Sequence, residues 1–240
     1  MKKKIEVKKH LKLKNPPLVE ALFILQFDPT MDYSLFAGAI NNGMKELFPE
    51  AETLPPVNIN GMPNMFRHRF TSADKSVLFQ TAPGMLSVNH LHYGQFKKFF
   101  ELIDIILFEL MKIESTPMIR MMGLQYINRI SLEKKSMEDI VAIKVSLPKI
   151  LESHLDAKSY NFLISEDTNG KLQVTISNTV RNNKPVSDEI AIDFEHFVEV
   201  SDNWNVSKIN TWIESAHDNI IEAFTGCLNP AYLKEIQKTK

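Results

Sequence analysis

The sequence predicts an α+β fold of two pseudo-repeated halves, each with the order strand, helix, strands, helix. Segments with an apolar residue at every second position alternate with segments whose apolar residues recur every three or four positions, which is typical of strands and helices respectively. This order occurs twice, at an offset of roughly 105–110 residues. Antiparallel strands in such units carry helices on one face. We therefore expect a curved, mainly antiparallel sheet with helices on one face.

The first half is predicted to span residues 18–117. It begins after Pro16 and Pro17, because adjacent prolines fit neither a helix interior nor a strand ladder. Its leading strand, 18–27, places Ala21, Phe23 and Leu25 on one face. The other elements expected here are a helix at 33–47 with Asp32 as N-cap, a loop at 50–64 with a short strand at 57–59, strands at 65–71, 76–81 and 85–92, and a helix at 94–112.

The second half is predicted to span residues 118–240 and to form one compact unit with the first. The elements expected here are a strand at 119–132, a helix at 137–151 with Ser136 as N-cap, a hairpin of 160–166 with 171–180, a strand at 189–200, and a helix at 206–224 with Asn205 as N-cap. Asn169-Gly170 supplies the positive φ angles of the hairpin turn.

Composition indicates a globular protein of the cytoplasm. The chain has 240 residues, of which 44% are hydrophobic and 24% charged, and these are ordinary values. Its one cysteine, Cys227, excludes an internal disulfide and favours a reducing compartment. No apolar run is long enough to cross a bilayer, and none follows the basic start as a secretory signal requires.

A basic arm, residues 1–17, precedes the first half. Residues 1–14 carry seven lysines and one glutamate, a net charge of +6, which leaves −7 on the rest because the whole chain carries −1. The lysines are Lys2, Lys3, Lys4, Lys8, Lys9, Lys12 and Lys14. Such an arm fits contact with nucleic acid or an acidic partner. The alternative is a solvated terminus, or an edge strand in which lysines prevent aggregation.

Two motifs carry a resemblance to a protein family. Asn15-Pro16-Pro17-Leu18-Val19-Glu20-Ala21 leads into the first strand, and Tyr126-Ile127-Asn128-Arg129-Ile130 lies on the leading strand of the second half. Both resemble the hallmarks of an uncharacterised, sporadically distributed family of bacteria and archaea with N-x-P-L-V-E-A and Y-I-N-R-I motifs. The family has no assigned activity. Its distribution implies an accessory role, such as a component of a defence or toxin–antitoxin-like cassette.

The motifs place four candidate binding or seam residues on the two leading strands: Glu20, Tyr126, Asn128 and Arg129. Alternation puts Tyr126 and Asn128 on an apolar face, where a buried amide requires hydrogen-bond partners. If the two leading strands pair at the centre of the sheet, Glu20 and Arg129 form an ion pair that sets the register of the halves. The alternative is a polar binding pocket on the concave face.

Weaker ligand candidates are His68, His90, His92, Arg67 and Arg69. His90 and His92 project to one side of a strand, and a third histidine from a neighbouring strand would complete a zinc site. No acidic ligand accompanies them, so no metal is predicted. The two arginines offer phosphate or nucleic-acid contact, with a solvated face as the alternative.

The sequence therefore favours a non-enzymatic binding protein. It contains no dinucleotide-binding, phosphate-loop, nucleophile-elbow or metalloprotease motif, and no cofactor is predicted. An uncovered sheet face and free sheet edges suit a protein partner or self-association. The alternative is a small-molecule-binding domain or enzyme that uses the cleft between the halves, with Glu20, Arg129 and His90 or His92 inside.

Overall fold

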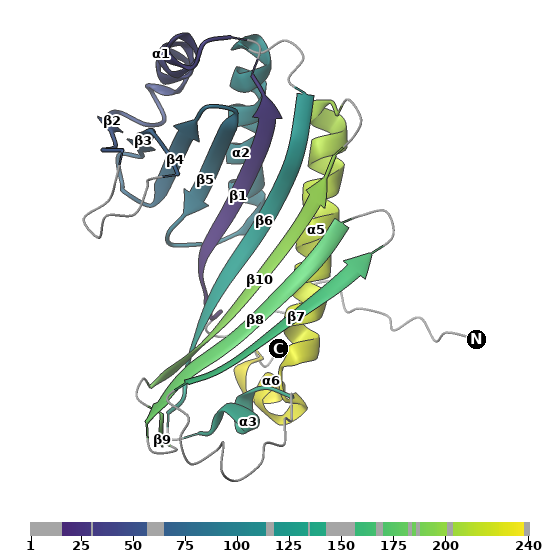
Figure 1. The fold of residues 1–240 in the computed structure, drawn as a ribbon. Helices are drawn as coiled ribbons and strands as arrows, with labels where there is room; N and C mark the ends of the chain where they lie inside the picture. Colours follow the sequence, from purple (N-terminus) through teal and green to yellow (C-terminus); the bar gives the residue numbers. More distant parts are fainter. Residues whose placement is uncertain are drawn as a thin grey trace.

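The computed structural model describes residues 16–29, 31–56, 65–113, 118–133, 135–142, 157–166, 170–181, 184–185, 188–200 and 204–237. These residues form a ten-stranded antiparallel sheet and five helices, which confirms the α+β class (Figure 1). The strands are β1 (Leu18–Asp28), β2 (Glu50–Thr53), β3 (His68–Thr71), β4 (Val77–Ala82), β5 (Met85–His90), β6 (Met118–Ser131), β7 (Ala157–Glu166), β8 (Gly170–Arg181), β9 (Lys184–Pro185) and β10 (Glu189–Glu199). The helices are α1 (Tyr33–Met44), α2 (Phe96–Ile113), α3 (Met137–Ile140), α5 (Val206–Cys227) and α6 (Pro230–Ile236).

The two leading strands, β1 and β6, lie side by side in the middle of the sheet. The strand order is β2-β3-β4-β5-β1-β6-β10-β8-β7, with β9 paired to β8 (Figure 1). The condition that the two leading strands pair at the centre of the sheet is therefore met, and their antiparallel pairing places Phe23 opposite Leu124. A register shift between Leu18 and Glu20 marks an irregularity near the start of β1. Strands β2 and β7 form the two edges.

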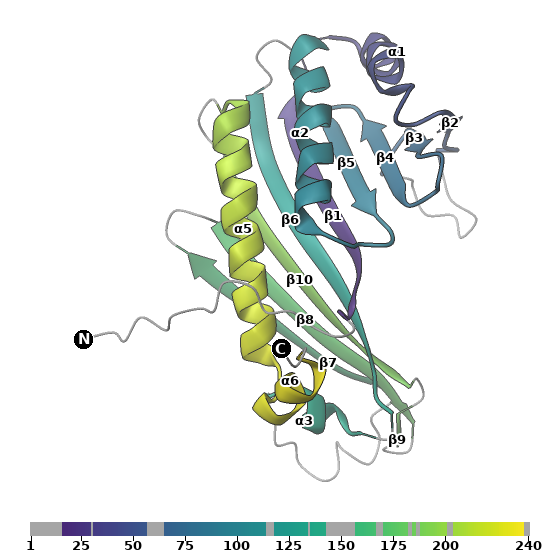
Figure 2. The ribbon, with the colours of Figure 1, turned by 180° about the vertical axis from the view of Figure 1, so that it is seen from behind.

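Helices α2 and α5 cover one face of this sheet (Figure 2). On β1 the side chains of Ala21, Phe23, Leu25 and Phe27 are buried, and those between them are half-buried. The same alternation on β6 and β10 buries every second side chain against the helices, as a sheet with one covered face requires. The core therefore lies between the sheet and the helices, and no described helix covers the opposite face.

Three helix starts are as predicted. The Asp32 side chain accepts a hydrogen bond from the Ser34 amide at 2.8 Å, and that of Asn205 accepts one from the Lys208 amide at 2.9 Å. Ser136 forms a capping box with Asp139. These caps stabilise helix N-termini by satisfying amides that lack a partner within the helix.

The predicted helix at 137–151 is wrong at Val141 and Ala142. Val141 is extended and forms a backbone bridge with Leu228, while the Ala142 amide donates to the Cys227 carbonyl at 2.8 Å. Long-range pairing with the end of α5 therefore takes Val141 and Ala142 out of the helix. Residues 143–151 lie outside the described residues.

Two further differences concern short elements. Strand β2 lies within the predicted loop at 50–64, while the short strand expected at 57–59 falls outside the described residues. Helix α6 was not predicted, although Asn229 caps it and Pro230 occupies its first turn. In the part of the chain that the structure describes, no helix is both long and apolar enough to cross a membrane.

Candidate binding surface on the uncovered sheet face

The four seam candidates point to opposite faces of the sheet. Tyr126 and Asn128 are buried on the helix side, as the alternation predicts. Glu20 and Arg129 are half-buried on the uncovered face. They therefore do not form one site, and only Glu20 and Arg129 are placed where a partner would meet them.

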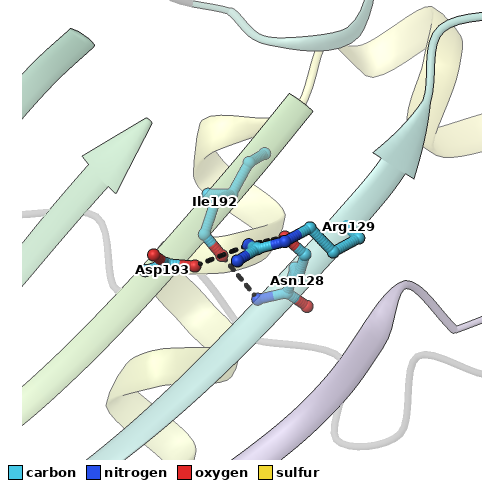
Figure 3. Close-up of polar contacts among 4 residues, drawn as sticks. All are labelled: Asn128, Arg129, Ile192 and Asp193. Carbon is cyan, nitrogen blue, oxygen red and sulfur yellow. Dashed lines mark hydrogen bonds and ion pairs between the residues drawn. The ribbon is translucent and has the colours of Figure 1, made fainter. Parts of the chain in front are cut away.

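Arg129 pairs with Asp193 of β10, not with Glu20 (Figure 3). Its Nη1 lies 3.1 Å from Asp193 Oδ1 and also donates to the Asn128 carbonyl at 3.0 Å. The predicted Glu20–Arg129 ion pair is thus wrong. Glu20 and Asp193 lie on either side of Ile127, and Glu20 has another partner on β5.

Asn128 fastens β6 to β10 from inside the core (Figure 3). Its Nδ2 donates to the Ile192 carbonyl at 2.9 Å, and Ile192 is also its register partner. The expectation that this buried amide finds a hydrogen-bond partner is confirmed. Asn128 is therefore almost inaccessible to a partner, since only 4% of it is exposed.

Glu20 ends a row of hydrogen-bonded side chains on the uncovered face, which we call the polar row. The row crosses β2, β3, β4, β5 and β1 and consists of Glu52, Arg69, Gln80, Ser87, Asn89 and Glu20. Arg69 donates to Glu52 at 3.1 Å and to Gln80 at 3.3 Å. Gln80 donates to Ser87 at 3.5 Å, Ser87 to Asn89 at 3.3 Å, and Asn89 Nδ2 to Glu20 Oε1 at 2.9 Å. The row therefore terminates on a carboxylate at each end.

Glu195 occupies a different setting on the same face. It lies between Gln125 of β6 and Gln173 of β8, which are its register partners on either side. Burial raises the pKa of the Glu195 carboxyl, although no described helix covers this face of β10. Among the described residues, no hydrogen bond or ion pair of its carboxylate offsets this burial. Glu195 is thus a partly desolvated acid with two amide side chains beside it.

Tyr126 belongs to a cluster on the helix side. Its hydroxyl lies 2.7 Å from Nδ1 of His217 on α5 and 3.4 Å from the hydroxyl of Tyr93. The His217 ring stacks on Phe96 of α2 with centroids 3.7 Å apart. Burial lowers the pKa of His217 to about 4 and raises that of Tyr93 to about 12, so both groups are neutral near pH 7. The cluster joins β6, α2 and α5 inside the fold.

The three histidine candidates do not converge. His68 lies opposite Thr81 and His90 opposite Val77, at the two ends of β4. His68 Nδ1 lies 2.8 Å from the Tyr33 hydroxyl, and His92 is exposed beyond β5. The described residues contain no group of three side chains suited to a metal ion.

The two arginine candidates also differ. Arg69 belongs to the polar row, whereas the exposed Arg67 contributes a backbone hydrogen bond from its amide to the Thr81 carbonyl at 2.8 Å. The described basic arm is limited to Pro16 and Pro17, so its predicted contacts lie outside the described residues.

Sequence reasoning missed Asn89, Asp193, Glu195 and His217. Alternation on 85–92 and 189–200 places the first three on the face opposite the apolar residues, which is a usable signal. A second usable signal is that His217 lies four residues after Ile213, on the buried stripe of its helix. Their partners depend on strand order, which alternation does not reveal.

Two comparisons with known proteins found no match. No protein-family model matches the chain, and no curated protein matches it.

Proposed function

We propose that this chain is a non-enzymatic binding protein whose uncovered sheet face docks onto a protein partner. The observation that carries the proposal is Glu195, a half-buried carboxylate with a raised pKa and no compensating contact among the described residues. A carboxylate in such a setting is stabilised when a cation approaches it. Its position on a face without a described helix leaves that approach open.

The neighbouring side chains define the chemistry of the partner. Gln125 and Gln173 flank Glu195 in register, so they offer amide donors and acceptors on both sides of the carboxylate. A lysine or arginine of the partner would pair with Glu195 and donate hydrogen bonds to the side-chain oxygens of Gln125 and Gln173. Arg129 and Asp193 on the same face already form an ion pair with each other. They therefore offer the partner a surface to contact but no unpaired charge.

The wider role follows from the family resemblance and the composition. We place the protein in the cytoplasm as an accessory component of a defence or toxin–antitoxin-like cassette. Its two halves are proposed to be a duplicated unit, and the adjacency of β1 to β5 and of β6 to β10 supports this. The basic arm remains a proposed contact for nucleic acid.

A comparative capture experiment tests the docking surface. Tagged wild-type chain, Glu195→Gln and the control Glu222→Gln are each used to capture proteins from the native host, followed by mass spectrometry. Glu222 is an exposed glutamate on α5, on the other side of the sheet. We expect one partner to be captured by wild type and Glu222→Gln but lost with Glu195→Gln. Identical sets from all three chains would contradict the proposal.

A further inference from the structure

Strand β7 forms an edge of the sheet with an apolar centre. In the described part of the chain its only strand partner is β8, so its outer backbone groups face no other strand (Figure 1). Three consecutive large side chains at its centre are exposed: Phe162 by 38%, Leu163 by 58% and Ile164 by 49%. Consecutive residues alternate between faces, so both faces of this edge are apolar.

The opposite edge is protected in the usual way. Strand β2 has four residues, all of them exposed, and two are glutamates. One of these, Glu52, is paired with Arg69 of β3. Short, charged edge strands resist pairing with other chains, whereas long apolar ones promote it. The ten-residue β7 lacks this protection at its centre, so its edge is suited to a further strand.

We propose that β7 pairs antiparallel with β7 of a second copy of this chain and joins two sheets into one. Antiparallel pairing centred on Phe162 is self-complementary, because it sets Phe162 opposite Phe162, Tyr160 opposite Ile164, and Asn161 opposite Leu163. The same register sets position 158, a lysine, opposite position 166, a glutamate, at both ends of the paired strands. Apolar centre and opposite terminal charges thus both match under a two-fold axis.

The helix layer leaves room for this arrangement. Helix α5 packs chiefly on β10 and β6, and it leaves the centre of β7 partly exposed. Phe162 and Ile164 are on the helix side of β7, in register with Val174 and Leu172 of β8, which are buried. A second copy would cover them with its own Phe162 and Tyr160. The two uncovered faces would then continue into each other through Leu163.

The test is the oligomeric state of charge-swapped variants. Sedimentation velocity over a range of concentrations is applied to wild type, Phe162→Lys, Phe162→Glu, their equimolar mixture, and the control Leu35→Lys. Leu35 is 67% exposed on α1 and away from β7. We expect wild type and Leu35→Lys each to form a dimer. Each Phe162 variant should dimerise roughly a hundredfold more weakly, since two facing charges replace two packed rings. The mixture should recover the dimer, because lysine then faces glutamate.

Any of three results would overturn the proposal. The first is a wild-type chain that stays monomeric at every concentration. The second is a dimer that persists in both Phe162 variants, and the third is a mixture that recovers none of the lost association. Circular dichroism of each variant confirms that it is folded, so a misfolded variant is not mistaken for a dissociated one.

Discussion

The two faces of the sheet differ in how their polar side chains are hydrogen-bonded. On the helix side, Asn128 and the Tyr126–His217 pair are matched by partners at 2.9 and 2.7 Å. On the uncovered side, the polar row is linked throughout, but Glu195 is flanked only by two glutamines. Water is excluded from the first face, so most polar groups there have partners within the fold, although the buried Nδ1 of His90 has no hydrogen-bond partner among the described residues. The second face is only partly shielded, since Glu195 is half-buried there, although Ser87 of the polar row is fully buried.

The largest expected difference between the faces comes from two phenylalanines of β10. Phe194 is fully buried on the helix side and packs edge-on against Phe224 with ring centroids 6.0 Å apart, while Phe197 is half-buried on the uncovered side. Phe194→Ala should lower the free energy of unfolding by about 3–5 kcal/mol. Phe197→Ala should lower it by about 1 kcal/mol. Urea denaturation at one protein concentration measures both, and equal losses would show that the uncovered face is packed like a core.

Acid should weaken the helix side through His217. Burial lowers the folded-state pKa of His217 to about 4, below the value near 6.5 of an unfolded histidine. As pH falls from 6.5 to 4, the unfolded chain therefore binds a proton that the folded chain does not. Stability is fully present above pH 6.5 and should fall by roughly 2–3 kcal/mol across this window.

Two histidine variants isolate this contribution. His217→Gln should flatten the dependence of unfolding free energy on pH between 6.5 and 4, whereas His92→Gln, at an exposed position, should retain the wild-type slope. Urea denaturation at a series of pH values provides the measurement. An unchanged slope in His217→Gln would assign the acid sensitivity to other groups.

The smallest effect is expected at the end of the polar row. Glu20→Ala removes the acceptor for Asn89 Nδ2 and should lower the free energy of unfolding by about 1 kcal/mol. The pair Glu20→Ala and Asn89→Ala, combined in a double-mutant cycle, should show coupling between the two positions. If Glu20→Ala melts like wild type but loses the captured partner, Glu20 belongs to the docking surface and not to the seam.

Local patterns predicted most elements of the fold. Alternation located β1, β6 and β10, and it assigned the buried faces of β1 and β6 through Phe23, Tyr126 and Asn128. Capping residues located the starts of α1, α3 and α5. These features depend on neighbours within a few positions, so one sequence is enough to find them.

The contacts of the candidate surface were harder to predict because they depend on register. Glu20 and Arg129 lie on the same face, but the irregularity at the start of β1 and the neighbouring strands β5 and β10 decided their partners. The early end of α3 has the same origin, since Leu228 lies far along the chain from Val141. Strand order, which no local pattern contains, determines these contacts.

The central position of β1 has a consequence for synthesis on the ribosome. β1 is made first among the strands, yet one of its two neighbours, β6, ends at Ser131, after α2 has ended at Ile113. At typical elongation rates this separates the completion of α2 from that of β6 by about 1–4 s. During that time β1 is an edge strand of the nascent first half, although it lies in the middle of the sheet in the finished protein. The polar side chains that β1 shares with β5, including Glu20 and Asn89, lie beside that temporary edge and reduce its attraction for other nascent chains.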